Sequence, residues 1–418
     1  MGYRQGFQEE ACTKCTVCTT VCPVSMVTPL YAGPKQSGPD QSRWRRKGAE
    51  YYDDSLKLCL NCKRCEVACP SGVQIGDIIQ NARSCAGSKK FSLRGAMLGN
   101  TDLMGAMATR VAPLANATLR LRSVRWFLDS VLGVDKKREF PQYASRTFVR
   151  WFNREARGKQ LKYTSFVSFF HGCYVNWNYP QLGKDVVMVL NALGYGVRLL
   201  EGERCCGVAL LSNGLTKQAR RHGLDNLKSI RNALGAGSER VVGASSTCIF
   251  TVRDEYPHLL ELENADVREG VDLITRFVMR LVNSGSKRLI FKEQPERMRV
   301  AYHAPCHLLR MGWESYTVSL LRMMPIALTI LDSNCCGIAG TYGFKKELSS
   351  ISQRIGEPLF RQIKGLSPDV VSTDCETCKW QIEMSVGVKV EHPISILARL
   401  LDLPACERAN GASKEVVN

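Results

Sequence analysis

The sequence of 418 residues predicts an α + α/β protein, in which a mostly helical N-terminal module precedes a duplicated α/β domain with parallel sheets. Two internal duplications carry this prediction. A run of four cysteines occurs twice before residue 70, and a Cys-Cys-Gly motif with further cysteines around it occurs twice in the remainder. Apolar strand-like runs alternate with helical stretches around the second duplication, and this alternation is typical of a parallel sheet.

The cysteine content indicates metal or redox chemistry. The chain has 19 cysteines, an odd number that fits a pure disulfide framework poorly. The first residues, MGYRQGFQEE, contain no apolar signal-peptide core, so we expect a reducing compartment in which thiols serve as ligands. The net charge of +18 is compatible with nucleic acid, an anionic membrane surface or acidic partners. No apolar stretch reaches the roughly 18 residues of a membrane-spanning helix, so any membrane contact is expected to be peripheral.

The two N-terminal cysteine runs share the spacing C-x2-C-x2-C-x3-C-P, which is the ligand run of two-cluster ferredoxins. Thiolates are soft ligands that suit iron and inorganic sulfide. In ferredoxins the fourth cysteine of each run serves the other cluster. We therefore expect two [4Fe–4S] clusters in a ferredoxin-type domain over residues 1–90. The predicted ligands are Cys12, Cys15, Cys18 and Cys69 for the first cluster, and Cys59, Cys62, Cys65 and Cys22 for the second.

Structural zinc is the alternative for these runs. Zinc sites typically use two C-x2–4-C pairs, whereas each run here has three cysteines at steps of three, a fourth at a step of four, and then a proline. The pattern therefore favours iron–sulfur. The segment 23–58 between the runs is longer than in a compact bacterial ferredoxin, and GDIIQNAR after the second run has helical character. A mostly helical module fits these features better than a small sheet-rich one.

The second duplication covers residues 161–290 and 296–405. Each copy contains Cys-Cys-Gly, in RCCGVA and NCCGIA, and in each the last cysteine lies 42 positions after the second cysteine of the pair. One position differs, because Ser245 stands in the first copy where Cys375 stands in the second. The cysteines of the first copy are Cys173, Cys205, Cys206 and Cys248, and those of the second are Cys306, Cys335, Cys336, Cys375 and Cys378.

These cysteines follow apolar runs that predict strands, such as SFVSFFHGC and RVAYHAPC. Because open α/β sheets bind ligands at the carboxyl edge of their strands, we expect the cysteines of each copy to meet there. The second copy is a candidate for a further iron–sulfur cluster. The first is a weaker candidate, since the oxygen of Ser245 is a harder ligand for iron. The alternative is that these are structural thiols of the core.

Three histidines, His171, His303 and His307, flank these cysteines. Each could hydrogen-bond to a cluster and tune its potential, handle a quinone proton, or serve as a structural residue at a strand end. Cys85 and Cys406 lie outside every motif and are expected to be spare thiols.

Residues 91–160 form a basic bridge between the two duplications, with 13 Lys and Arg against 5 Asp and Glu, a net charge of +8. Helical spacing over 114–131 predicts an amphipathic helix, and RTFVRWFNREAR mixes aromatic with basic residues. A core-packing helix with a solvated basic face, contact with a membrane interface and docking to a partner are all open interpretations. Nucleic acid is disfavoured because no recognised binding fold accompanies the charge. The apolar residues that give this helical spacing over 114–131 are Leu114, Ala117, Leu121, Val124, Leu128 and Val131.

Residues 406–418 are expected to be a C-terminal tail.

Several stretches together resemble one family, the iron–sulfur subunits related to heterodisulfide reductase subunits B and D. They include CTKCTVCTTVCPV, LCLNCKRCEVACPSGVQIGDIIQ, HAPCHLLRMGWESYT, CCGIAGTYGFKKE and VSTDCETCKWQIEMS. The family includes subunits of glycolate-, lactate- and glycerol-3-phosphate-oxidising complexes. The resemblance is greatest to the anaerobic glycerol-3-phosphate dehydrogenases, and it spans nearly the whole chain.

This resemblance implies an electron-transfer subunit that is not an enzyme on its own, so no catalytic residue is expected. It implies that flavin-containing subunits A and B oxidise glycerol 3-phosphate, while this chain passes their electrons to menaquinone. It also implies that the chain tethers them, as a peripheral protein, to the cytoplasmic face of the bacterial inner membrane. The alternatives are a glycolate or lactate complex, or reduction of a quinone or disulfide at the CCG site itself. The sequence shows no G-x-G-x-x-G after a strand and so no sign of binding flavin itself.

Overall fold

The computed structural model describes residues 8–47, 52–87, 92–332 and 334–411, and the N-terminal module within them is helical, as predicted. Residues 1–7, 48–51 and 88–90 of this module lie outside the described part. A small core of its own, with Leu56, Val73, Ile78 and Ile79 nearly inaccessible to solvent, holds the helices together. The elements of the module are η1 (Glu9–Ala11), α1 (Val17–Thr20), η2 (Gln36–Asp40), α2 (Gln41–Arg46), η3 (Asp54–Leu58), α3 (Arg64–Val67) and α4 (Ile75–Gly87).

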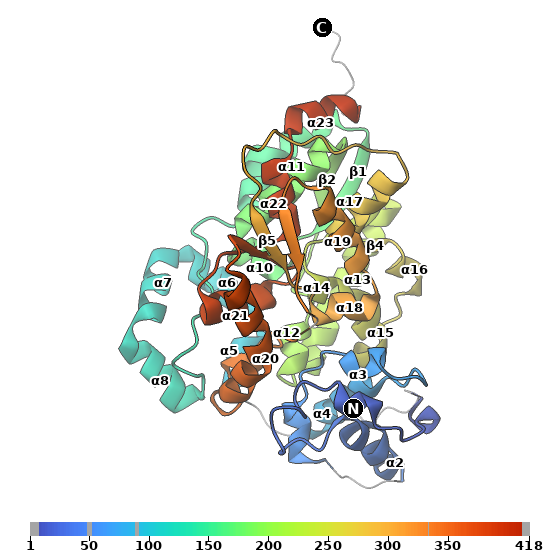
Figure 1. Cartoon of the computed structure of the whole chain (residues 1–418), viewed down its shortest axis with the longest axis vertical. Helices are drawn as coiled ribbons and strands as arrows, with labels where there is room; N and C mark the ends of the chain where they lie inside the picture. The colour runs from blue at the N-terminus through green and yellow to red at the C-terminus, as the bar shows by residue number, and fades with distance from the viewer. Residues whose placement is uncertain (1–7, 48–51, 88–91, 333, 412–418) are drawn as a thin grey trace.

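The basic bridge is a series of short helices, of which α7 and α8 lie apart from the two sheets at the edge of the molecule (Figure 1). The prediction of one continuous amphipathic helix over 114–131 is wrong, because Leu121 adopts an extended conformation (φ −64°, ψ 131°) between α7 and α8. The bridge contains α5 (Leu93–Gly99), α6 (Thr101–Arg110), α7 (Ala112–Arg120), α8 (Arg122–Leu132), α9 (Phe148–Trp151), η4 (Phe152–Ala156) and η5 (Arg157–Lys162).

The two parts of the bridge differ in burial. Phe148 and Phe152 are buried in the main core, and Trp151 packs against it. The aromatic and basic segment RTFVRWFNREAR is therefore a core-packing element. In contrast, Leu114, Leu121 and Val131 of the predicted amphipathic helix are more than half exposed.

The first CCG repeat is a parallel sheet with the strand order β2-β1-β3-β4, flanked by helices. β1 is central, and Phe166 pairs with Gly196 of β2 and Ser238 of β3. The elements of the repeat are β1 (Ser165–Phe170), α10 (Gly172–Trp177), α11 (Pro180–Ala192), β2 (Tyr195–Leu199), α12 (Val208–Ser212), α13 (Thr216–Gly235), β3 (Ser238–Gly243), α14 (Ser246–Phe250), η6 (Thr251–Glu255), α15 (Tyr256–Leu260), α16 (Ala265–Arg268), β4 (Val271–Leu273) and α17 (Ile274–Asn283).

The second repeat has the equivalent parallel order, β6-β5-β7-β8, which confirms the predicted duplicated α/β fold. Its elements are β5 (Arg299–Tyr302), α18 (Cys306–Met311), α19 (Glu314–Met323), β6 (Ala327–Ile330), η7 (Tyr342–Phe344), α20 (Lys346–Leu366), β7 (Val370–Ser372), α21 (Glu376–Val386), β8 (Val390–Glu391) and α22 (Pro393–Leu400). A last helix, α23 (Leu403–Ala409), spans the boundary at which the tail was expected to begin. Cys406 in it is fully buried, so the packed core extends past that boundary, and residues 412–418 lie outside the described part.

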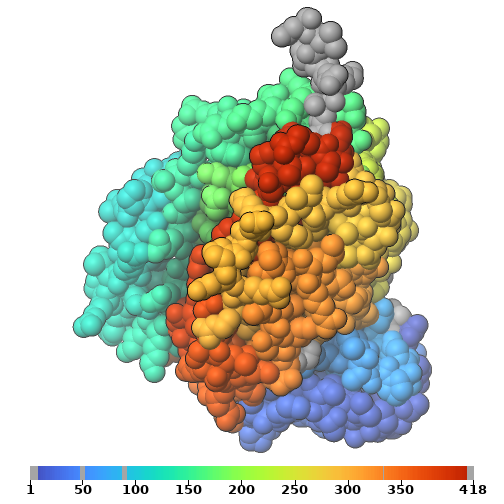
Figure 2. Space-filling view, turned by 45° about the horizontal axis from the view of Figure 1, so that its top comes forward, coloured from blue at the N-terminus to red at the C-terminus, as the bar shows by residue number. Residues whose placement is uncertain are grey.

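The two repeats share one apolar core and a buried polar interface. Side chains of α11 and α22, such as Leu190 and Leu397, belong to the same core cluster. The imidazole of His392 lies 2.8 Å from the Ala244 carbonyl oxygen, and the Ser246 amide donates to the Asp374 carbonyl at 2.9 Å. In the space-filling view, the N-terminal module lies directly against the second repeat (Figure 2).

Candidate metal centres

The first predicted ligand set comes together in the structure. Cys12, Cys15 and Cys18 of the first run and Cys69 of the second run line one pocket. Burial raises the pKa of the Cys18 thiol, and the nearby sulfurs of Cys12, Cys15 and Cys69 raise it further, against a hydrogen bond with Thr19. A buried thiol with three further sulfurs around it is suited to a cation that would stabilise its thiolate and be shared with its neighbours.

The second predicted set also comes together. Cys59, Cys62 and Cys65 line a pocket with Cys22 of the first run. Burial raises the pKa of Cys62 to about 12, and it raises the pKa of Cys59 and Cys65 as well. Each run thus contributes three thiols to one pocket and one to the other, which is the crossed arrangement predicted from the spacing.

The two cysteine loops have the same unusual backbone. The residues on either side of the middle cysteine have positive φ in both loops: Lys14 and Thr16 in the first, Asn61 and Lys63 in the second. These left-handed residues tighten the loop around the pocket, and the Asn61 amide donates to the Cys59 sulfur at 3.4 Å. The ammonium group of Lys63 is buried in an ion pair with Asp77, which anchors the second loop to α4.

Both pockets fit an iron–sulfur cluster by the chemistry of their linings. Each offers four sulfur donors, and among the described residues that line them neither pocket contains a carboxylate or an imidazole. Lys35 borders the first pocket, and Lys63 and Arg64 border the second. Soft donors with cations around them suit an anionic iron–thiolate group.

The cysteines of the second repeat lie beside the second ferredoxin set. All five border a cavity of about 90 Å³ that Cys59 and Cys62 also line. The sulfurs of Cys336 and Cys378 are 3.3 Å apart, and the Gly337 amide donates to the Cys335 sulfur at 3.4 Å. Hydrogen bonding with Cys378 lowers the pKa of Cys375 to about 6. Burial raises the pKa of Cys306, and hydrogen bonds with neighbouring thiols raise the pKa of Cys335 and Cys378. The repeat therefore gathers five sulfurs of differing acidity directly next to the ferredoxin module.

The first repeat also gathers its four cysteines. Hydrogen bonds with Cys173 and then Cys206 lower the pKa of Cys205 well below its usual value, and Cys206 in turn interacts with Cys248. Ser245 stands where the second repeat has its fifth thiol, and its hydroxyl caps α14 by accepting the Cys248 amide at 3.3 Å. These thiols lie at the carboxyl ends of β1, β2 and β3, as predicted.

Helix α6 of the bridge covers the first repeat's site, a contact that was not predicted from the sequence. Asp102 accepts a hydrogen bond from the Cys205 amide at 2.7 Å and from the Trp177 indole at 3.3 Å. Burial raises the pKa of this carboxyl. In the sequence, Asp102 is only an acidic residue in the first turn of a helix. Acidic residues are common at that position, so it does not indicate a site.

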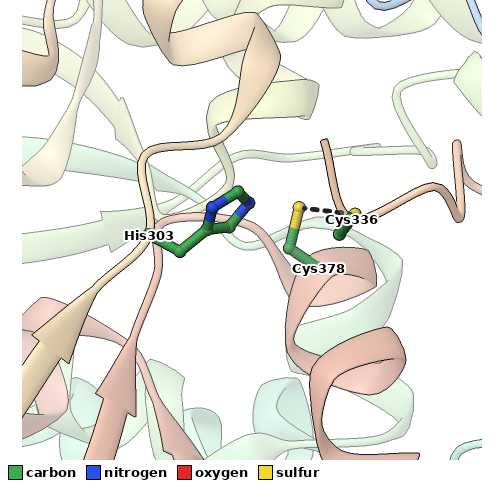
Figure 3. A group of neighbouring side chains, drawn as sticks. All are labelled: His303, Cys336 and Cys378. Carbon is green, nitrogen blue, oxygen red and sulfur yellow. Dashed lines mark hydrogen bonds between the residues drawn. The ribbon is translucent and has the colours of Figure 1, made fainter. Parts of the chain in front are cut away.

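The three flanking histidines have different surroundings. The imidazole of His307 lies 3.0 Å from the Asn61 carbonyl oxygen and 3.2 Å from the Thr247 hydroxyl, so it joins the second repeat to the second cysteine loop. Burial lowers the pKa of His171 to about 4, and its ring bonds to the Gly172 carbonyl. His303 lies within 4.8 Å of the sulfurs of Cys336 and Cys378 (Figure 3).

Two further contacts fix the ferredoxin module on the CCG repeats. Arg310 of α18 donates to Glu66 of α3 at 3.0 Å, and the Asn61 amide side chain donates to Glu255 at 2.6 Å. Because Asn61 and Glu66 flank cysteines of the second run, these contacts hold that run against the repeats.

Fold and sites together define an iron–sulfur protein with a two-cluster ferredoxin-type module and two CCG units. The 4Fe-4S dicluster domain family matches residues 8–73, and the cysteine-rich CCG domain family matches residues 167–253 and 300–383. The anaerobic glycerol-3-phosphate dehydrogenase of Escherichia coli K12 has a subunit, designated C, that is 53% identical over 393 residues, which cover 94% of this chain and 98% of that protein. The chain therefore belongs to the family of that subunit.

More distant relatives match all or part of the chain. The glycolate oxidase iron-sulfur subunit of Escherichia coli K12 is 23% identical, with 94% of each chain covered. Lactate utilization protein A of Bacillus licheniformis is 27% identical over 55% of this chain and 95% of that protein.

Proposed function

We propose that this chain is the electron-transfer iron–sulfur subunit of an anaerobic glycerol-3-phosphate dehydrogenase complex. In this proposal, electrons from flavin-containing subunits A and B pass through the chain to menaquinone. Cys12, Cys15, Cys18 and Cys69 would hold one [4Fe–4S] cluster, Cys59, Cys62, Cys65 and Cys22 the second, and the CCG cysteines of the second repeat a further iron–sulfur centre. When bound, such clusters supply one-electron carriers whose potentials depend on burial and on hydrogen bonds to sulfur.

The observation that carries the proposal is the cavity shared by Cys59 and Cys62 with all five CCG cysteines of the second repeat. Donor sets that border one cavity are close enough for electron transfer between them. The protein's own contribution is rigid spacing and exclusion of water, since an apolar cluster packs the second set against the repeat. That cluster includes Leu58, Leu60, Leu348 and Ile351 together with Cys22 and Cys335.

Cys62→Ala in the purified complex tests the relay. We expect the flavin subunits to keep their activity with a soluble dye, while quinone-linked turnover falls to below about a tenth of the unmodified rate. Cys85→Ala is the matched control, because Cys85 is buried in the same module but belongs to neither thiol set. Unchanged quinone-linked turnover in Cys62→Ala would rule out the relay.

The proposal includes tethering to an anionic membrane surface through α6, α7 and α8. No helix in the described part of the chain is long and apolar enough to cross a membrane. These helices nevertheless expose large apolar side chains and carry exposed arginines, a combination that suits an anionic lipid interface. The exposed apolar residues are Leu103, Met107, Val111, Leu114, Leu121, Trp126, Phe127 and Val131. The exposed arginines are Arg110, Arg120 and Arg122.

Co-sedimentation with vesicles tests the tether. We expect the full chain to bind vesicles that contain phosphatidylglycerol, and Trp126→Gln with Phe127→Gln to weaken binding by about tenfold. Trp44→Gln is the matched control, since Trp44 is 63% exposed, close to the 62% of Trp126, but lies in the ferredoxin module. Equal binding by all variants, or loss of flavin-subunit binding with vesicle binding unchanged, would contradict a lipid contact here.

A further inference from the structure

His303 brings an imidazole to the cysteines of the second repeat. The residue follows β5, is only 2% exposed, and its ring points toward the sulfurs of Cys336 and Cys378 (Figure 3). One nitrogen of the ring and the two sulfurs all lie within 4.8 Å of one another. The nitrogen that faces the sulfurs is Nε2, while Nδ1 lies on the far side of the ring and has no hydrogen-bond partner among the described residues. The ring is also a hydrogen-bond partner of Cys336. A buried imidazole that presents a nitrogen to two thiols can bond to their sulfur or to a metal that the thiols hold.

The first repeat has no imidazole at this place. His303 lies three positions before Cys306, and the residue three positions before Cys173 is Phe170. Phe170 is also 2% exposed and packs in an apolar cluster with Cys205 and Cys206. The scaffold thus accepts a purely apolar ring at this position, so packing alone does not account for the histidine in the second repeat.

We propose that His303 is a ligand of iron in the second CCG unit, so that this unit binds its metal through imidazole and thiolate together. The inference rests on the proposed function, because it requires an iron–sulfur centre in this unit. Cys336 and Cys378 are the nearest thiolate ligands, and Cys306, Cys335 and Cys375 line the same cavity. Imidazole and thiolate both suit iron, and a mixed set is chemically distinct from the all-sulfur sets of the ferredoxin module.

A neutral imidazole in place of an anionic thiolate raises the reduction potential, as the histidine ligands do in Rieske centres. The second ferredoxin set, at the other side of the shared cavity, contains four thiols and no imidazole among the described residues of its pocket. We therefore expect the second CCG centre to have the higher potential of the two. Electrons would then be favoured to move from the ferredoxin module into the CCG repeat.

The test is made on the full chain, purified without oxygen after labelling of histidine with 15N. At a potential that reduces the CCG centre first, pulsed EPR is expected to show strong 15N coupling from a directly bound nitrogen. His303→Phe, which installs the residue of the first repeat, is expected to abolish the coupling. His307→Gln is the control and is expected to keep it, because both nitrogens of His307 already have partners at 3.0 and 3.2 Å.

His303→Cys keeps the inference testable if the phenylalanine variant loses iron. We expect this variant to retain the centre, to lose the 15N coupling and to shift the potential to a more negative value. Coupling that persists in His303→Phe, or only the weak coupling of a hydrogen bond to sulfur in the unmodified chain, would overturn the inference while leaving the centre in place. Iron limited to the two ferredoxin clusters, or zinc in the CCG unit, would overturn both the inference and the proposed CCG iron centre.

Discussion

The two CCG repeats have one topology but different neighbours. Both sheets have the equivalent strand order, and both gather cysteines at the carboxyl ends of the strands. The cysteines of the second repeat border a cavity with Cys59 and Cys62, whereas Cys205 in the first repeat is covered by Asp102 of the bridge. Both repeats contact the ferredoxin module, but among the described residues only the cysteines of the second repeat share a cavity with ferredoxin cysteines. In the proposed function, this shared cavity, more than the number of cysteines, distinguishes the site suited to electron transfer.

The glycine of the motif gives the largest expected difference between the repeats. Gly207 and Gly337 both have positive φ, at 95° and 83°. A Cβ on Gly337 would lie 2.1 Å from the Ser352 carbonyl oxygen, whereas one on Gly207 would lie 3.4 Å from the Ala219 methyl group. We expect Gly207→Ala to lower the free energy of unfolding by about 1–2 kcal/mol through backbone strain, and Gly337→Ala by about 4 kcal/mol because a clash is added.

Denaturant unfolding of the two alanine variants measures this difference. Equal losses would contradict the tighter packing of the motif against α20 in the second repeat.

Lys345 gives a smaller difference in stability between the two repeats, and this difference depends on pH. It lies nine positions after the cysteine pair, at the start of α20, and Leu215 has the same place before α13. Burial, with Arg83 and Arg94 nearby, lowers the pKa of Lys345 from 10.5 to about 8. The unfolded chain therefore binds more protons between these values, so the stability of the iron-free chain rises with pH across this range.

Lys345→Leu is expected to remove this rise and to stabilise the iron-free chain at pH 7 by about 2 kcal/mol, allowing for partial exposure of the side chain. Denaturant unfolding of the iron-free chain at pH 7 and pH 9 measures this change in stability and in its pH dependence. Lys364→Leu, at an exposed position of α20, is the control that should leave the pH dependence intact. A pH dependence retained in Lys345→Leu would show that another group causes it.

The crossed thiol sets and the sheet edges could be predicted because their signals are local. The spacing of Cys12, Cys15 and Cys18 fixes a loop, and each CCG cysteine lies within about seven residues after the end of its strand. The cover of Cys205 by Asp102 could not be predicted, since it joins residues 103 positions apart through a helix with no distinctive pattern. The break at Leu121 could not be predicted either, because apolar spacing continues across it while the backbone changes direction there.

The smallest expected effect comes from Ser245, which occupies the one cysteine position at which the two repeats differ. Its hydroxyl caps α14, whereas Cys375 begins α21 without a side-chain cap. Ser245→Cys therefore loses a cap, at a cost of about 1 kcal/mol, but places a thiol where the fold accepts one.

If the first repeat lies outside the electron path, quinone-linked turnover of Ser245→Cys should stay within about twofold of the unmodified complex. Ser246→Ala, which removes a buried hydroxyl with no partner among the described residues, controls for packing at this turn. A severalfold change in Ser245→Cys alone would show that the first repeat also carries electrons, and the cavity shared with Cys59 and Cys62 would then no longer distinguish the two sites.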